Sequence, residues 1–297
     1  MSFKSGFVTI VGRPNVGKST LLNRFAGEKI AIISEKPQTT RNSIKAVITD
    51  EDSQIIFIDT PGVHKPKTKL GEYMISVVQE SLNEVDIVLF LVEATNSAPG
   101  AGDQYIIEQL KDLKTPVFLL INKIDLVKKE QLLAVIANYK NLMDFAEIIP
   151  ISAVNNEGID IVLKEIRKRL PDGPKYFPDD MLTDQPEKAI VAELIREKIL
   201  ELLSDEVPHG TGIEVISFKE RTNKELIDID ATIYCEKESH KAIIIGKEGR
   251  MLKKIGSRSR EDIERFLGTR VYLRLWVKVK DDWRNSDAML KTLGYRK

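Results

Sequence analysis

The chain has 297 residues, of which 42% are hydrophobic and 30% charged. This is enough for about two domains of ordinary size, and the mixture is typical of folded proteins. A single cysteine, Cys235, excludes an internal disulfide and a thiolate zinc cluster. The apolar runs are only strand-length, far short of the roughly 18 residues that cross a bilayer, and residues 1–7 lack the apolar region of a secretory signal. We therefore expect a cytoplasmic protein.

The charge is balanced overall but unevenly distributed. Lysine plus arginine and aspartate plus glutamate both total 45, so the formal net charge is zero. Residues 241–297 nevertheless carry 16 basic and 7 acidic side chains, while the first 240 residues carry 29 basic and 38 acidic ones. A basic C-terminal end in a neutral chain indicates a segment that meets a polyanion.

The first 170 residues alternate short apolar runs with amphipathic helical patterns. The pattern predicts strands at 7–11, 44–48, 55–58, 87–92, 117–121 and 148–151, and helices at 19–26, 70–82, 103–113, 129–139 and 159–170. Such alternation is typical of an α/β fold whose mostly parallel sheet is covered on both faces. Ligands of these sheets bind beyond the carboxyl ends of the strands, so the loops after the strands are where we look for chemistry.

A proline-bearing stretch then separates two patterns. Four prolines fall within sixteen residues, at positions 171, 174, 178 and 186, which predicts a linker over 171–186. Beyond it, we expect a helix (187–203), two strands (213–218 and 226–235), two helices (239–245 and 251–267) and a last strand (271–279). The predicted domains are therefore residues 1–170 and 187–297, the second an α+β domain.

The first chemical motif follows the strand at 7–11 and opens the helix at 19–26. It fits the phosphate-binding pattern G-x-x-x-x-G-K-[ST] and consists of Gly12, Arg13, Pro14, Asn15, Val16, Gly17, Lys18 and Ser19, followed by Thr20. Glycines let backbone N–H groups surround phosphate oxygens, and the helix N-terminus adds positive potential. Lys18 is expected to bridge the β- and γ-phosphates, and the Ser19 hydroxyl to ligate Mg²⁺.

Three further motifs indicate which class of phosphate-loop protein this sequence belongs to. The strand at 55–58 leads into Asp59, Thr60, Pro61 and Gly62, the strand at 117–121 into Asn122, Lys123, Ile124 and Asp125, and the strand at 148–151 into Ser152 and Ala153. Asp59 can hold Mg²⁺ through water, and the Gly62 N–H can contact a γ-phosphate. Together these motifs, each at a strand's carboxyl end, predict a site for GTP and GDP.

The hydrogen-bond donors of guanine account for the carboxylate at the end of the motif, Asp125. Guanine presents donors at N1 and N2, which a carboxylate accepts as a pair, whereas adenine would leave that carboxylate without donors. Lys123 would pack its stem over the base, and Asn122 would tie the base loop to the phosphate loop. A backbone N–H of the Ser152-Ala153 loop would donate to guanine O6.

These residues resemble the translation-factor-like class of regulatory GTPases, over residues 5–170. In that class a switch threonine completes the Mg²⁺ shell, so the resemblance gives Ser19, Asp59 and Thr40 as metal ligands, with Thr39 as the rival of Thr40. With Lys18 and Gly62, Thr40 and Asp59 form the predicted catalytic set.

One position departs from the Ras-like pattern. In Ras-like enzymes the residue directly after the Asp59–Gly62 motif is a glutamine, which orients the attacking water. This chain has Val63 at that position, whose side chain forms no hydrogen bond. Asn15 resembles the asparagine that helps to bind K⁺ beside the phosphates in related GTPases without the glutamine. The hypothesis is slow, K⁺-stimulated hydrolysis; the alternative is that Asn15 only shapes the loop.

The C-terminal motif is a G-x-x-G turn between two predicted helices. In KH modules such a turn clamps about four single-stranded nucleotides, and the element order here matches the second KH topology. The predicted RNA contacts are Ile245, Gly246, Lys247, Glu248, Gly249, Arg250 and Lys253. Aromatic residues are sparse near the turn, so base stacking is not expected there, and the sequence leaves the places of Trp276 and Trp283 open.

A GTPase domain followed by a KH domain is similar to the Era family of GTPases. The resemblance covers essentially the whole chain and extends to residues 186–187, 206–209 and 244–249. It implies a GTP-switched, monomeric factor that binds the 3′ end of small-subunit (16S) ribosomal RNA and assists maturation of that subunit. It also implies a peripheral association with the cytoplasmic membrane, for which the residues give no independent argument.

Three alternatives remain at this point. A GTPase of transfer-RNA modification would need a further catalytic domain, for which 297 residues leave little room. A nucleotide kinase is argued against by the guanine motif. A non-enzymatic RNA chaperone would use GTP only as a structural ligand.

Overall fold

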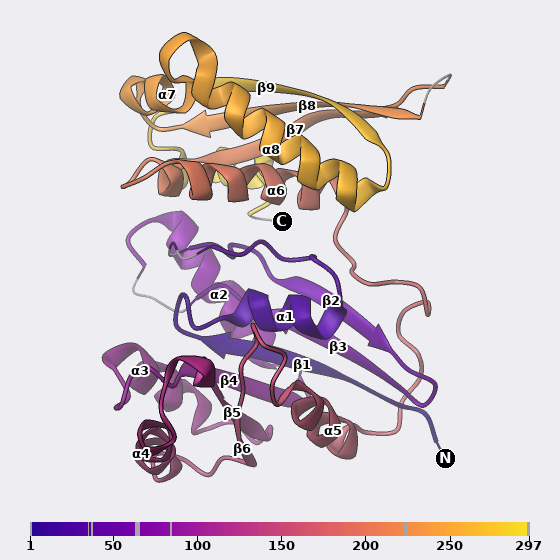
Figure 1. Ribbon diagram of the computed structural model, residues 1–297, viewed down its shortest axis with the longest axis vertical. Helices are drawn as coiled ribbons and strands as arrows, with labels where there is room; N and C mark the ends of the chain where they lie inside the picture. The colour runs from indigo at the N-terminus through magenta and orange to yellow at the C-terminus, as the bar shows by residue number, and fades with distance from the viewer. Residues whose placement is uncertain are drawn as a thin grey trace. The chain divides into compact units, whose positions relative to one another are not determined.

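The structure is a computed structural model that describes residues 2–34, 36, 38–62, 66–83, 85–222 and 225–295. The chain divides into two compact units (Figure 1). The first comprises residues 1–31, 40–65 and 74–184, and the second comprises 32–39, 66–73 and 185–297. No helix within the described ranges is both long and apolar enough to span a membrane.

The first unit is built on a six-stranded sheet in the order β2-β3-β1-β4-β5-β6. Its strands are β1 (Lys4–Gly12), β2 (Ile44–Thr49), β3 (Ser53–Asp59), β4 (Ile87–Glu93), β5 (Val117–Asn122) and β6 (Glu147–Pro150). Only β2 runs antiparallel to its neighbour. The predicted α/β fold with a mostly parallel sheet is confirmed, and the carboxyl ends of β1, β3, β4, β5 and β6 share one edge.

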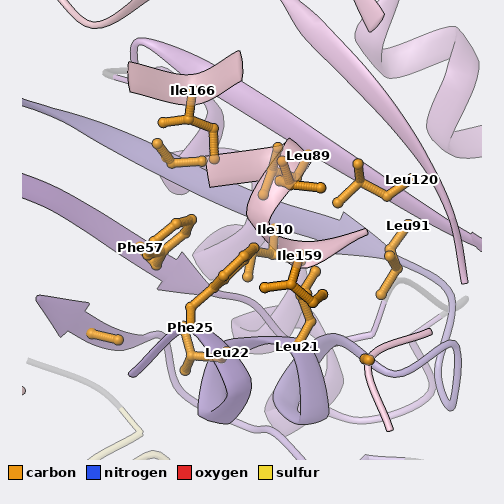
Figure 2. Packing of buried hydrophobic residues seen from close by; sticks show 14 of the residues in the cluster. Ile10, Leu21, Leu22, Phe25, Phe57, Leu89, Leu91, Leu120, Ile159 and Ile166 are labelled. Carbon is orange, nitrogen blue, oxygen red and sulfur yellow. The ribbon is translucent and has the colours of Figure 1, made fainter. Parts of the chain in front are cut away.

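Helices cover both faces of this sheet. On one face, α1 (Lys18–Ala26) and α5 (Ile159–Arg169) bury their apolar sides, and Figure 2 shows Leu21, Leu22 and Phe25 of α1 within that cluster. On the other face lie α3 (Ala101–Leu110), α4 (Lys129–Lys140) and the part of α2 (Lys69–Asn83) that belongs to this unit. Burial on both faces explains why β4 and β5 are apolar up to their last residues, Glu93 and Asn122.

The proline-bearing stretch is hydrogen-bonded to the first unit as far as residue 182. The Gln54 side chain accepts from the backbone N–H groups of Tyr176 and Phe177 at 2.7 and 3.0 Å, and the Val47 N–H donates to the Leu182 carbonyl at 2.9 Å. The fully buried Gln54 side chain thus satisfies two backbone N–H groups of a segment that lies outside regular secondary structure.

The second unit contains a three-stranded sheet in the order β7-β8-β9. Its elements are α6 (Glu187–Leu202), β7 (Gly212–Glu220), β8 (Leu226–Cys235), α7 (Glu238–Ile245), α8 (Arg250–Leu267), β9 (Arg270–Val279) and α9 (Asp287–Thr292). β7 and β8 are antiparallel, β8 and β9 parallel. The helices α6, α7 and α8 pack on one face around Ile229, Ile244, Ile255 and Ile263. Trp283 is fully buried and donates to the Gly210 carbonyl at 2.8 Å.

Candidate functional site

The phosphate loop connects β1 to α1 and closes around the side chain of Lys18. Gly17 has φ +104°, a conformation that L side chains rarely adopt, and a Cβ there would collide with the amide of Asn122. The Lys18 ammonium is buried and donates to the carbonyls of Gly12 and Arg13 at 3.0 and 2.9 Å. Burial lowers the pKa of Lys18 to about 8, against the opposing attraction of Asp59.

Three oxygen-bearing side chains converge where β3 ends beside α1. Ser19 Oγ donates to Asp59 Oδ2 at 2.8 Å and lies 2.9 Å from Thr40 Oγ1, which itself donates to the same carboxylate oxygen at 3.3 Å. Asp59 is fully buried, and burial raises its pKa even though Lys18 attracts a negative charge there. Its Oδ1 is buried without a hydrogen-bond partner among the described residues.

This donor set fits Mg²⁺, a hard cation that takes hydroxyl, carboxylate and water oxygens. The unpartnered Oδ1 of Asp59 is the kind of buried acceptor that a cation or its water shell satisfies. Of the two adjacent threonines, the structure brings Thr40 to this cluster. Thr39 instead donates its hydroxyl to the Lys36 carbonyl at 2.6 Å.

The residues after Asp59 lie against the phosphate loop. Thr60 is buried and donates to the Ile10 carbonyl at 2.7 Å. A Cβ on Gly62 would lie 2.8 Å from Pro14 Cγ, so the backbone passes too close to the phosphate loop for any residue with a side chain. Val63, the position expected to lack a water-orienting side chain, lies outside the described residues.

The base-reading motifs are linked directly to the phosphate loop. Asn122 donates to the Val16 carbonyl at 2.8 Å and accepts from the Ala153 N–H at 3.0 Å, which joins three loops through one side chain. Asp125 accepts from Ser152 Oγ at 2.6 Å, so its carboxylate is held at the end of β5. The arrangement leaves this carboxylate exposed to a base that approaches from solvent.

Lys123 adds a second link between the base and phosphate loops. Its ammonium donates to the Asn15 carbonyl at 2.8 Å and pairs with Glu93 at the end of β4. Glu93 belongs to none of the sequence motifs. Its position offered a signal, because β4 pairs in parallel with β5 and places Glu93 directly opposite Asn122.

Both backbone N–H groups that were predicted as donors to guanine O6 are already hydrogen-bonded within the protein. The Ser152 N–H donates to the Glu157 carbonyl at 3.0 Å, and the Ala153 N–H is engaged by Asn122. An O6 contact from this pair therefore requires one of these internal bonds to exchange for the base.

A buried network beside the phosphate loop was also absent from the sequence reasoning. Arg13 Nε donates to the fully buried carboxylate of Asp103 at 2.8 Å, and the Tyr139 hydroxyl donates to the same group at 3.0 Å. The Gly100 N–H, at the start of α3, is a third donor at 3.1 Å. Two helices, α3 and α4, thus fix the carboxylate that holds Arg13. Asp103 is 90 positions from Arg13 and 36 from Tyr139 in the chain, so no local pattern could reveal these two contacts.

The G-x-x-G turn lies between α7 and α8, as the sequence indicated. Gly246 has φ +71°, and a Cβ there would lie 2.7 Å from Met251 Cβ and 3.0 Å from the Met251 nitrogen. Both the dihedral and the close approach require glycine. Arg250 and Glu248 in this turn form an exposed ion pair at 2.8 Å, an interaction of little strength in water.

A groove of about 390 Å³ runs from this turn between α8 and β9. Of the predicted contacts, Gly249 and Lys253 line it. The other lining residues are Leu252, Gly256, Ser257, Arg260, Leu273 and Leu275. Ile244 and Ile255, which flank the turn, are fully buried in the core and do not line the groove. The floor comes from Leu252 and β9, and the missed α8 residues follow Lys253 at helical spacing.

Comparisons with known proteins match both units of the chain. Residues 7–123 match the family model described as 50S ribosome-binding GTPase, and residues 206–284 match the KH domain model. The chain is 66% identical over 296 residues to GTPase Era of Ruminiclostridium cellulolyticum, which covers 100% of this chain and 99% of that protein. It is 55% identical to GTPase Era of Clostridioides difficile over 294 residues, 99% of each chain.

Two solved structures resemble the whole chain. A Tyr-to-Ala variant of Era from Aquifex aeolicus, bound to GDP and AlF4⁻, superposes with a TM-score of 0.95 at 40% identity, covering 99% of this chain and 100% of that one. An Era complex with MgGDPNP and nucleotides 1506–1542 of 16S ribosomal RNA gives a TM-score of 0.94 at the same identity and coverage.

The phosphate-loop fold of the first unit and the KH fold of the second define a P-loop GTPase joined to an RNA-binding module. The chain belongs to the Era family of GTPases. This family assignment excludes the nucleotide kinase and the non-enzymatic chaperone.

The lowered pKa of Lys18 predicts that nucleotide binding takes up a proton above pH 8. Phosphates stabilise the ammonium form, so binding raises the pKa of a side chain that is partly neutral at pH 8.5 in the free protein. Calorimetry of GDP binding in two buffers with different ionisation enthalpies should show this uptake at pH 8.5 and little at pH 7. Lys18→Arg keeps the charge without titrating in this range and should show none. Uptake that is equal at both pH values would contradict the assignment.

The network around Asp103 predicts faster nucleotide release when its charge is removed. Asp103→Asn leaves the Arg13 guanidinium without its ion partner and should destabilise the fold by about 1–3 kcal/mol. Tyr139→Phe removes only a neutral donor to the same carboxylate and should cost about 0.5–1.5 kcal/mol. Urea denaturation gives the stabilities, and displacement of a fluorescent GDP analogue gives the release rates. A wild-type release rate for Asp103→Asn would show that Arg13 needs no anchor.

Proposed function

We propose that this GTPase hydrolyses GTP with Mg²⁺ held by Ser19, Thr40 and Asp59. When bound, the ion neutralises charge that develops on the transferred phosphoryl group. Lys18 adds a positive charge on the phosphates, and the Gly62 N–H contacts the γ-phosphate. The observation that supports this is the convergence of the Ser19 and Thr40 hydroxyls on Asp59 Oδ2, while Asp59 Oδ1 is buried without a hydrogen-bond partner among the described residues.

We further propose that Asp125 selects guanine and that Asn15 contributes to a K⁺ site. The exposed Asp125 carboxylate, held by Ser152, matches the two donors of guanine. Asn15 has φ +68° and offers its carbonyl to Lys123, so its place in the loop is fixed. A cation there would supply charge stabilisation in a chain that has valine where Ras-like enzymes have glutamine.

For the second unit we propose binding of the 3′ end of 16S ribosomal RNA, in support of small-subunit maturation. The observation that carries this is the groove of α8 and β9, which combines the G-x-x-G turn, an apolar floor and the cations Lys253 and Arg260. Such a groove fits a single strand, with phosphates at the glycine turn and bases on the floor. An Era structure holding nucleotides 1506–1542 of 16S ribosomal RNA supports the choice of RNA.

A switch connects the two activities in this proposal. Residues 32–39 belong to the second unit, where Arg196 of α6 donates to the carbonyls of Gln38 and Thr39. In the same unit the Ile33 N–H donates to Glu197 at 2.9 Å. The next residue, Thr40, is the proposed metal ligand of the first unit. A change at Thr40 after hydrolysis therefore pulls on a segment that is packed against α6, and GTP in this way controls access to the RNA groove.

The test is RNA crosslinking and sequencing on protein loaded with GDPNP or with GDP. We expect enrichment of the 3′ end of 16S ribosomal RNA in the GDPNP state. Gly246→Asp should abolish this enrichment while leaving hydrolysis without RNA unchanged, because it adds a negative charge and backbone strain at the turn. Gly268→Asp is the matched control: this glycine also has positive φ (+66°) but lies at the far end of α8 with open space around it.

Two outcomes would count against parts of this proposal. Enrichment of other RNAs, or of none, would overturn the ribosomal target and leave the GTPase intact. Equal enrichment with GDPNP and GDP would overturn the switch, because a ligand that binds two states equally cannot shift them.

The K⁺ site makes a separate prediction. Hydrolysis should be about tenfold or more faster in KCl than in NaCl at equal ionic strength, since one additional stabilised charge in the transition state is worth at least that. Asn15→Ala should lose most of this difference and keep the Mg²⁺ requirement. Steady-state phosphate release measures both. Equal rates in the two salts would eliminate the site.

A further inference from the structure

The strand β9 carries two different surfaces. Its inward side chains pack against the helices and form part of the core; they are Val271, Leu273, Leu275, Val277 and Val279. The alternate side chains share the opposite face of the sheet and follow the order basic, aromatic, basic, aromatic, basic; they are Arg270, Tyr272, Arg274, Trp276 and Lys278. The helices α6, α7 and α8 cover only the inward face.

Trp276 is the more exposed of the two aromatic side chains that β9 places on this outer face. It is 58% exposed, whereas the other tryptophan of the chain, Trp283, is fully buried. The side chain of Trp276 makes no hydrogen bond and no ring contact with any residue that the structure describes. Its indole ring therefore offers a flat apolar surface to solvent without a role in the fold.

Tyr272 lies on the same face, four residues before Trp276, and is 51% exposed. The guanidinium groups of Arg221 and Arg274 each lie 5.8 Å from the centre of its ring. Both arginines are fixed by two-pronged ion pairs, Arg221 with Asp228 and Arg274 with Asp230, at 2.6–2.7 Å. Tyr272 is thus part of an ordered cluster of flat side chains on the surface.

The charges of this face favour a polyanion. Asp228 and Asp230 are neutralised by the two arginines, and Glu214 accepts from the Tyr234 hydroxyl at 2.7 Å. Arg270 and Lys278, at the two ends of β9, form no ion pair with any described residue. β9 itself carries no acidic side chain. Planar rings between unpaired cations are the combination that single-stranded nucleic acids bind by stacking and charge.

The outer face is continuous with the proposed RNA groove. Leu273 and Leu275, which line that groove, alternate along β9 with Tyr272, Arg274 and Trp276. β9 is also the edge strand of the sheet, so no further strand separates its two faces. A strand of RNA that leaves the groove needs only to pass over this edge to reach the aromatic side chains.

We propose that the outer face of β9 is a second RNA-binding surface, on which unpaired bases stack against Trp276 and Tyr272 while Arg270 and Lys278 bind phosphates. The two rings are about 13 Å apart along the strand, so each receives a different base. This inference rests on the proposed binding of RNA in the groove and extends the contact to nucleotides outside it.

The test uses the fluorescence of the full-length protein, loaded with GDPNP and titrated with RNA of the sequence 1506–1542 of 16S ribosomal RNA. Because Trp283 is buried, Trp276 is the tryptophan that solvent quenchers reach. We expect saturating RNA to change its emission and protect it from acrylamide. Trp276→Ala should weaken RNA binding by about 5- to 100-fold, the range for loss of one stacked base, and Trp276→Phe by less because it keeps a ring.

The outcomes separate this surface from the groove. If Gly246→Asp abolishes binding while Trp276→Ala binds RNA as the wild type does, RNA binding in the groove stands and the second surface is wrong. Saturating RNA that leaves the emission and quenching of Trp276 unchanged overturns it equally. A wild-type protein that binds no RNA overturns both proposals. Unchanged RNA affinity of Trp276→Ala together with loss of a protein contact would assign this face to a protein partner instead.

Discussion

Two buried charges of opposite sign, Lys18 and Asp59, are the constraint on which the nucleotide site depends. Burial disfavours the charged form of both, lowering the pKa of the lysine and raising that of the aspartate. The fold tolerates this because β1 and β3 are parallel neighbours, so the loops after them meet and the groups partly compensate each other. A site with a charged ammonium and an unsatisfied carboxylate oxygen is arranged for an anion and a cation together, as in a nucleotide with its metal.

Much of this arrangement could be predicted from sequence, because it follows from local patterns. Apolar runs locate the strands, and a residue directly after a strand must lie at the edge of the sheet, which placed Asp59, Asn122 and Ser152 correctly at the same edge. Contacts between distant segments left no such pattern. The Asp103 carboxylate is buried beside Arg13, which is 90 residues away in the chain, and the Gln54 side chain is bonded to the stretch that was predicted as a linker.

The second unit also contains features that a local sequence pattern predicts and features that depend on contacts between distant residues. Gly246 and Gly249 make the G-x-x-G turn recognisable in the sequence, because both have the positive φ values that glycine adopts readily. The two tryptophans could not be told apart by composition, although the alternation of β9 does place Trp276 opposite the apolar residues that build the core. Trp283 follows the last strand in a short turn, where no periodicity exists, and its buried indole N–H donates to the carbonyl of Gly210, 73 residues away.

The adjacent residues Thr39 and Thr40 explain how the proposed switch can work through a connection of only two residues. The hydroxyl of Thr40 bonds to the carboxylate that would hold the metal, and the carbonyl of Thr39 accepts from Arg196, a fully buried cation of α6. One peptide bond separates the two. A guanidinium without exposure cannot readily exchange its carbonyl partners for water, so moving Thr40 by even one bond length forces Arg196 either to follow or to lose a hydrogen bond. Coupling of this kind needs no long pathway through the core, only a covalent connection between two well-anchored residues.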